Sequence, residues 1–274
     1  MDTIIHLARA VLPLAYFALV VDYALLFLRR HPVAERLAPP LLLSTLCVHL
    51  AYLFALGTKW QQLPTATVPQ GLTLVAFAAA LVYGVVEWIG DEKTTGVWMM
   101  TLVFLLQLLS SLTKSTGTPP ELDLFRSPAF VVHICLALVG YAAAVVAAVY
   151  GFLFLALHRE LKSGRFRLFF GRLPALEILD RMTTSALVVS FLGLAGAVAG
   201  GIFWGVQIGY DVWWRDTKIL LTVGVCLISG GALLLRRFGR LQGRQIAFVS
   251  LAGLLVILFS LMISNFLSAG FHLF

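Results

Sequence analysis

Segment 209–218 brings ionisable and aromatic side chains together between two long apolar runs. It reads GYDVWWRDTK, and its charged residues and tryptophans are Asp211, Arg215, Asp216, Lys218, Trp213 and Trp214. Tryptophan and lysine are usual anchors of a membrane protein at the boundary between lipid and water. The same residue types suit a ligand site, because indole rings contact flat apolar molecules and cationic side chains pair with anionic groups. The segment therefore predicts either a membrane-interface loop or a ligand site.

Histidines supply the candidate metal ligands. His133 lies two turns into a predicted helix, and His272 follows the last apolar run. Neutral imidazole is a good ligand for haem iron, and two imidazoles on opposite faces of the porphyrin ring give a six-coordinate site. The alternative for both residues is an ordinary surface or packing role.

The tryptophan-rich segment contains the other parts that a haem site needs. Trp213 and Trp214 offer a flat aromatic surface to the porphyrin. Arg126, Arg215 and Lys218 are cations on the same predicted side of the membrane, where they suit the two propionates. We therefore take these five residues and the neighbouring Asp216 as candidate haem contacts, together with the two histidines.

His49 is a separate candidate, because it falls inside an apolar run rather than at its end. An ionisable group at membrane depth is costly, and such a residue is functional by default. We include His49 among the candidate cofactor contacts. A hydrogen bond to a neighbouring helix is the alternative.

The elements that position these residues are transmembrane helices. The 274-residue chain is 60% hydrophobic and 12% charged, about half the charged fraction of a soluble domain. Its apolar runs are long enough to cross a bilayer, which takes about 20 residues each. They predict helices at 8–29, 39–57, 69–90, 95–113, 127–158, 183–208, 217–236 and 245–269. We expect an all-α polytopic membrane protein, a bundle of about eight transmembrane helices that forms a single membrane domain over 1–274.

The basic residues indicate how the bundle is oriented. Most of the 20 Lys and Arg residues fall in alternate loops, chiefly in 29–36, 159–181 and 236–244. The positive-inside rule assigns these loops to the cytoplasm. Both termini and segment 209–218 are then on the outer, periplasmic side, and 159–182 is a cytoplasmic amphipathic linker at the lipid surface. The net charge of +7 is thereby explained without a nucleic-acid partner.

Two further residue types have structural interpretations. Small residues recur on the sixth predicted helix, at Gly193, Gly196, Gly200 and Gly201, a spacing that predicts close helix packing. The three cysteines, Cys47, Cys135 and Cys226, lie inside predicted helices and form no CxxC or CxxCH motif. The sequence therefore contains neither a dithiol redox motif nor a site for covalent haem attachment.

Segment 129–274 resembles the haem-handling "WWD" superfamily of cytochrome c assembly proteins, which includes CcsA, CcmC and HemX-like proteins. HICLALVGYAAAVVAAVYG, beginning at His133, is similar to the helix that carries the family's first external haem ligand. LDRMTTSALVVSFLGLAGAVAGGIFW, ending at Trp204, is similar to the helix that enters the tryptophan-rich loop. The terminal GFHLF is similar to the family ending that carries the second ligand, here His272.

The loop itself departs from the family pattern Trp-x-Trp-Asp-Pro-Lys-Glu. Trp213, Asp216 and Lys218 match, whereas Arg215 stands where the second tryptophan is expected. Some members also place a histidine on the helix that follows the loop, and Leu234 occupies about that position here.

The resemblance implies a bacterial inner-membrane protein that holds haem b at the outer face for chaperoning or delivery. His133 and His272 would be the axial ligands, and the partners would be other cytochrome c maturation or membrane redox subunits, with apocytochrome c among them. The sequence shows no evident nucleophile or acid–base pair, so a haem chaperone or accessory subunit is favoured over a stand-alone enzyme. Two alternatives stay open: a haem-b electron-transfer subunit, and a HemX-like regulatory or scaffold protein without haem.

Overall fold

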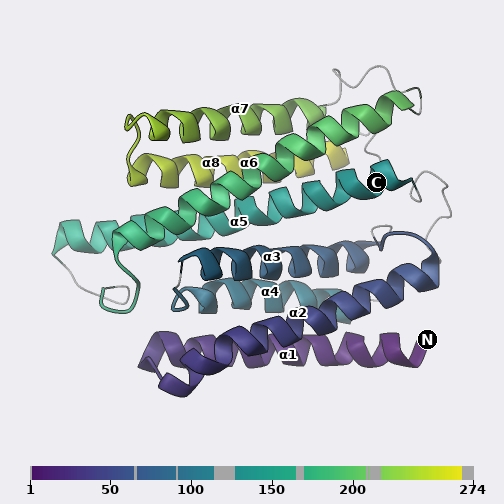
Figure 1. Cartoon of the computed structure of the whole chain (residues 1–274), viewed down its shortest axis with the longest axis horizontal. Helices are drawn as coiled ribbons and strands as arrows, with labels where there is room; N and C mark the ends of the chain where they lie inside the picture. The colour runs from purple at the N-terminus through teal and green to yellow at the C-terminus, as the bar shows by residue number, and fades with distance from the viewer. Residues whose placement is uncertain are drawn as a thin grey trace. The chain divides into compact units, whose positions relative to one another are not determined.

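The computed structural model describes residues 2–64, 67–90, 92–113, 127–164, 170–207, 209 and 217–266. These residues form eight α-helices and no strand (Figure 1). The helices are α1 (Asp2–Arg29), α2 (Pro32–Trp60), α3 (Val68–Gly90), α4 (Gly96–Leu112), α5 (Pro128–Ser163), α6 (Leu176–Gln207), α7 (Thr217–Arg237) and α8 (Gly243–Phe266). Six of them are long and apolar enough to cross a membrane. The predicted all-α architecture and its eight helices are confirmed.

The helices form two compact units. Unit 1 comprises Met1–Arg126 and Arg165–Pro174, and unit 2 comprises Ser127–Gly164 and Ala175–Phe274. In unit 1, α1 packs against α2 and α4, and α3 packs against α4. In unit 2, α5 packs against α6 and α8, and α7 packs against α8. Unit 2 contains the helices that carry His133 and flank segment 208–216.

Several helices extend beyond their predicted ends. α2 begins at Pro32 rather than at residue 39, and it contains Pro39 and Pro40 in its interior. α5 continues to Ser163 and α6 begins at Leu176, so both ends of the predicted 159–182 linker are helical. A prediction from hydropathy ends a segment at its first charged residues. The helix itself can continue through such residues as long as its backbone hydrogen bonds are made.

Proline in α1 is accommodated by a polar contact with α4. Pro13 has no N–H, which leaves the carbonyl of Arg9 without its intrahelical donor. The hydroxyl of Ser111 donates to this carbonyl at 2.9 Å. In return, the Arg9 guanidinium donates to the backbone carbonyls of Ser111 at 3.0 Å, of Ser110 and of Thr113. Arg9 therefore caps the C-terminus of α4, where helix carbonyls lack partners.

Glycines allow α5 and α6 to approach closely. A Cβ atom on Gly193 would lie 2.8 Å from the Cα and N atoms of Gly140. A Cβ on Gly140 would lie 2.7 Å from the backbone nitrogen of Leu194, and a Cβ on Gly196 would lie 3.2 Å from the side chain of Leu136. The prediction of close helix packing is confirmed for Gly193 and Gly196.

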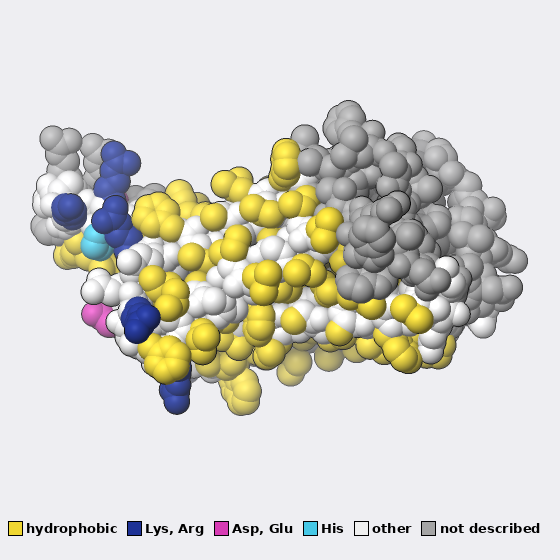
Figure 2. Space-filling view, turned by 90° about the horizontal axis from the view of Figure 1, so that it is seen from above, with side chains coloured by type: hydrophobic (Ala, Val, Ile, Leu, Met, Phe, Trp, Pro, Cys, Tyr) yellow, Lys and Arg dark blue, Asp and Glu magenta, His cyan; other side chains and the backbone are white. Residues whose placement is uncertain are grey.

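The outward side chains of α7 and α8 are apolar. Leu220, Leu227, Leu255 and Phe259 are each more than half exposed. Figure 2 shows apolar side chains covering the middle of this face, with Lys and Arg gathered at one end. An exposed apolar surface this extensive is unusual in a soluble monomer and matches the lipid-facing surface of a membrane bundle. The chain is a multi-pass membrane protein.

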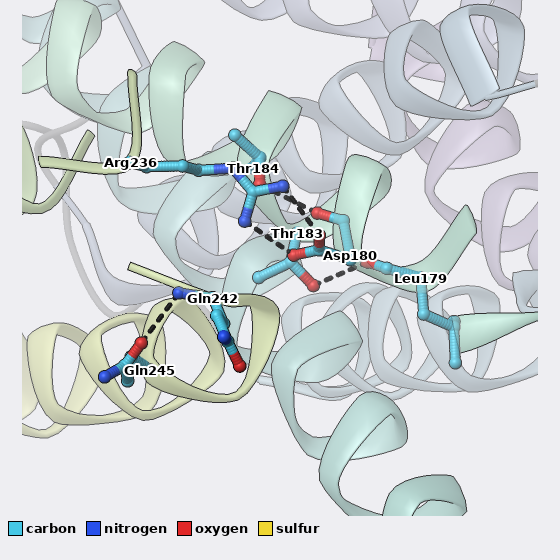
Figure 3. Close-up of polar contacts among 7 residues, drawn as sticks. All are labelled: Leu179, Asp180, Thr183, Thr184, Arg236, Gln242 and Gln245. Atoms are coloured by element: carbon cyan, nitrogen blue, oxygen red, sulfur yellow. Dashed lines mark hydrogen bonds and ion pairs between the residues drawn. The ribbon is translucent and has the colours of Figure 1, made fainter. Parts of the chain in front are cut away.

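An ion pair joins α6 and α7 at the end of unit 2 where α6 begins. Arg236 at the end of α7 donates through both Nη atoms to the carboxylate of Asp180, at 2.8 and 2.6 Å (Figure 3). Gly243 starts α8 against the same carboxylate, because a Cβ there would lie 2.8 Å from Asp180 Cγ. The two side chains are 26% and 21% exposed, so this bidentate pair is partly shielded from water.

Asp180→Asn should lower the stability of unit 2 by about 1–3 kcal/mol, the usual loss for hydrogen bonds to a charged group. The melting temperature of the full chain in detergent measures this effect. Glu177→Gln is the matched control, because that carboxylate is exposed on the same helix and has no ion-pair partner among the described residues. The double variant Asp180→Arg with Arg236→Asp should recover part of the loss, and no recovery would assign the effect to something other than the pair.

Candidate functional site

The candidate site lies at the end of unit 2 opposite the Asp180–Arg236 pair. α5 begins there at Pro128, α6 ends there at Gln207 and α7 begins there at Thr217 (Figure 1). The last described residues of α8 lie at the same end. Consecutive helices of the unit run in opposite directions. His133, the residues on either side of segment 208–216 and the end of α8 therefore lie at one end of the unit.

His133 is held against the backbone of α6. Its Nδ1 atom lies 2.7 Å from the carbonyl oxygen of Ala197. A carbonyl oxygen can only accept, so Nδ1 carries the proton and donates it. The neutral ring then has its lone pair on Nε2.

Gly201 makes this position of the imidazole available. A Cβ atom at Gly201 would lie 2.7 Å from both Cε1 and Nδ1 of His133. A side chain there would therefore displace the ring from Ala197. Gly201 is a packing glycine by the sequence pattern, and the structure gives it a second role in orienting His133.

An aromatic pair lies beside the histidine. Phe130, one turn before His133, packs on Trp204, one turn after Gly201, with ring centroids 5.0 Å apart and an angle of 52° between the planes. Both side chains are buried. This pair fixes the start of α5 against the end of α6 next to segment 208–216.

Most of the other predicted site residues lie outside the described residues. They are Arg126, Trp213, Trp214, Arg215, Asp216 and His272. Lys218 belongs to the first turn of α7, but its side chain is not among the described ones. Their roles stay predictions. Within the described part of the chain, no group of three or more His, Cys, Asp or Glu side chains could hold a metal ion.

His49 belongs to unit 1 and is fully buried in a hydrogen-bonded chain. Tyr16 lies 2.8 Å from its Nδ1 atom, and Thr73 Oγ1 lies 2.9 Å from its Nε2 atom. Thr73 donates its proton to Gln107 Oε1 at 2.7 Å. The oxygen of Thr73 must therefore accept from Nε2–H, and Nδ1 accepts the hydroxyl proton of Tyr16.

This arrangement links all four helices of unit 1 through one neutral imidazole. Both ring nitrogens of His49 make hydrogen bonds to neighbouring helices. This is the alternative to a cofactor contact that the sequence left open. Binding to iron would require one of the two hydrogen bonds to break in a buried environment, where an unsatisfied polar group costs about 1–3 kcal/mol.

Sequence reasoning missed three features of these helices. The carbonyl of Ala197 could not be found from the sequence, because every residue carries one. The aromatic partner Phe130 gave no distinct signal in an apolar run. Glu87 did give one, as an acidic residue inside a membrane span, and it is buried with Tyr23 donating to its Oε2 atom at 2.7 Å and Tyr83 donating to the same oxygen.

Comparison with known proteins places these observations in a family. Residues 33–272 match the family described as Cytochrome C assembly protein. The chain belongs to the cytochrome c assembly protein family. The match runs from α2 to the C-terminal segment and so includes most of both units, whereas the sequence resemblance rested on 129–274.

Individual relatives of this cytochrome c assembly protein carry two names. A cytochrome c biogenesis protein CcsA from Synechococcus sp. (strain CC9902) is 27% identical over 242 residues, which are 78% of this chain and 79% of the relative. A protein HemX from Bacillus subtilis (strain 168) is 27% identical over 148 residues, which are 54% of this chain and 53% of the relative. Both names fall within the superfamily identified from the sequence.

Proposed function

We propose that this cytochrome c assembly protein binds haem b at the outer face of a bacterial inner membrane, for chaperoning or delivery. The observation that carries the proposal is the hydrogen bond from His133 Nδ1 to the Ala197 carbonyl. A histidine that ligates a metal almost always donates its other ring N–H to a carbonyl or carboxylate, which fixes the ring and its tautomer. His133 has this arrangement, with Nε2 as the ligating atom.

The location of the basic residues supports the outer face. In unit 2, the loop between α7 and α8 and the adjoining helix ends carry Arg236, Arg237, Arg240 and Arg244. These lie at the end opposite His133. The positive-inside rule places that end in the cytoplasm, and the His133 end outside.

The remaining contacts are assigned from the sequence. His272 would be the second histidine that holds the iron, and Trp213 and Trp214 would contact the porphyrin beside Asp216. Arg126, Arg215 and Lys218 would pair with the propionates. His49 is left out of this set, because its hydrogen bonds already use both of its nitrogens.

The haem would supply the redox-active iron and the porphyrin that assembly attaches to a cytochrome. The protein's own residues would hold and orient it. The chain has no CxxCH motif, so apocytochrome c or another maturation subunit must provide the thiols. A chaperone needs binding that can be reversed, which suits a ligand held by histidines and a loop rather than by covalent bonds.

A second candidate is a HemX-like regulatory or scaffold role without haem. The matches to two proteins named HemX favour it, as does Arg215 in place of a family tryptophan. The two candidates differ in one observable, the presence of haem.

The deciding experiment is an absorption spectrum of the full chain purified in detergent from cells with ample haem. We expect a reduced-minus-oxidised spectrum of a haem-b protein, and a pyridine haemochrome that identifies non-covalent haem b. A protein that purifies folded but without haem would contradict the proposal and favour the regulatory role.

A further inference from the structure

Unit 1 contains a cavity of about 280 Å³ at the end where α1 and α3 begin and α2 and α4 end. All four helices contribute to its walls. None of the described lining residues takes part in the candidate haem site, which is in unit 2. Any ligand of this cavity would therefore be distinct from the proposed haem.

The polar wall of the cavity is cationic. His6, Arg9 and Lys59 line it, and none of the described lining residues is acidic. The guanidinium of Arg9 and the ammonium of Lys59 both border this concave space, and an anion inside it would be attracted to both. The cavity thus has the charge of an anion-binding site.

The cationic side chains are held in place by their surroundings. Arg9 is fixed by its bonds from Nε and Nη2 to the carbonyls of α4. Its two Nη1 N–H groups make no hydrogen bond with any described residue. The ammonium of Lys59 lies over the ring of Trp60, 5.2 Å from the centroid. Side chains that are ordered before binding lose less entropy when a ligand arrives.

A buried hydroxyl adds a donor that the fold leaves unused. Thr67 lines the cavity, and its Oγ1 atom is buried with no hydrogen-bond partner among the described residues. Such an atom costs stability, and a native protein usually satisfies it with a ligand or water. An acceptor inside the cavity would satisfy it.

The rest of the wall is apolar, with Ile5, Leu56 and the indole of Trp60. We propose that this cavity binds the phosphate group of an anionic phospholipid. The phosphate oxygens would accept from Arg9, Lys59 and Thr67, and the glycerol and first methylenes would contact the apolar wall. A free phosphate ion would leave the apolar wall uncovered.

Native mass spectrometry of the full chain in detergent tests this proposal with short-chain lipids. Dioctanoyl phosphatidylglycerol should bind at least about fivefold more tightly than dioctanoyl phosphatidylcholine, because the choline ammonium offsets the phosphate charge and is repelled by the cavity's cations. Lys59→Gln and Thr67→Val should each reduce phosphatidylglycerol binding about fivefold, from the loss of one charge or one hydrogen bond. Phosphatidylcholine carries a phosphate too, so Thr67→Val should weaken the binding of both lipids, whereas Lys59→Gln should weaken the binding of phosphatidylglycerol more.

Arg29→Gln is the control, because Arg29 is an exposed cation at the other end of α1. It should leave the lipid preference unchanged. Equal affinity for the two lipids in the unmodified chain, or full phosphatidylglycerol binding in both cavity variants, would overturn the proposal. If inorganic phosphate alone competes fully with phosphatidylglycerol, the ligand is a soluble phosphate and the lipid assignment is wrong. Haem content should be unaffected by these variants, because none of the substituted residues belongs to the proposed haem site, so the two results can be told apart.

Discussion

His133→Ala is expected to lower the haem content of the purified protein about tenfold or more. The substitution removes the proposed ligand atom Nε2, and the loss of even a ligand's hydrogen-bond partner commonly costs about 10–100-fold in metal affinity. The measurement is haem per protein by pyridine haemochrome, together with the spin state from the absorption spectrum. His133 is half-buried beside α6, so the variant also loses a packing contact.

Two further variants separate ligand loss from misfolding. Adding imidazole to His133→Ala should restore part of the haem spectrum, because the free base can occupy the vacated ligand position. His158→Ala is the matched control on the same helix, where the ring stacks on Phe154 with centroids 6.1 Å apart. Haem content that survives His133→Ala at its original level would show that iron is bound elsewhere. Loss of haem in His158→Ala to the same degree would point to a general structural effect.

Gly201→Ala addresses the orientation of His133 without removing the ligand. Its Cβ would lie 2.7 Å from the imidazole, so the ring must move away from the Ala197 carbonyl. We expect reduced haem affinity with both proposed histidines still present, and hence a spectrum of unchanged type at lower occupancy. Unchanged affinity would mean that the hydrogen bond to Ala197 does not matter for binding.

Gly193→Ala is expected to destabilise the α5–α6 pair by about 1–3 kcal/mol, the usual cost of adding a methyl group to a filled interface. The new Cβ would lie 2.8 Å from the backbone of Gly140, and backbone atoms of a packed helix cannot rotate away as a side chain does. The helices must move apart, and the contacts along their length weaken. The melting temperature in detergent should fall.

Gly224→Ala supplies the control for the same chemical change. A Cβ atom at Gly224 on α7 meets nothing within 4 Å among the described residues. The substitution should leave the melting temperature equal or slightly higher, since alanine favours a helix over glycine by about 0.5–1 kcal/mol. Gly140→Ala, on the other side of the contact, should reproduce the loss seen for Gly193→Ala. Equal melting temperatures for the Gly193 and Gly224 variants would contradict close packing as the role of Gly193.

The sequence by itself determined the class of the protein and most of its elements. Long apolar runs predict helices because a bilayer leaves the backbone no other hydrogen-bond partners, and all eight were found. Helix ends were less predictable. Pro39 and Pro40 suggested a start for α2, yet Pro32 already occupies the first turn, where proline is best tolerated. The family was also readable, from the order of His133, Trp204 and the terminal GFHLF.

Only the tertiary structure decided what each of the two helical histidines contacts. His49 and His133 both lie in apolar helices, and the sequence offered each as a cofactor contact. Packing gives His49 two hydrogen-bonded neighbours from other helices, whereas His133 meets a backbone carbonyl through Nδ1. The difference depends on partners far away in the chain, on hydroxyls and carbonyls common to many residues. The residue types fix what an imidazole can do, and the packing of the helices selects which of its nitrogens donates and to what.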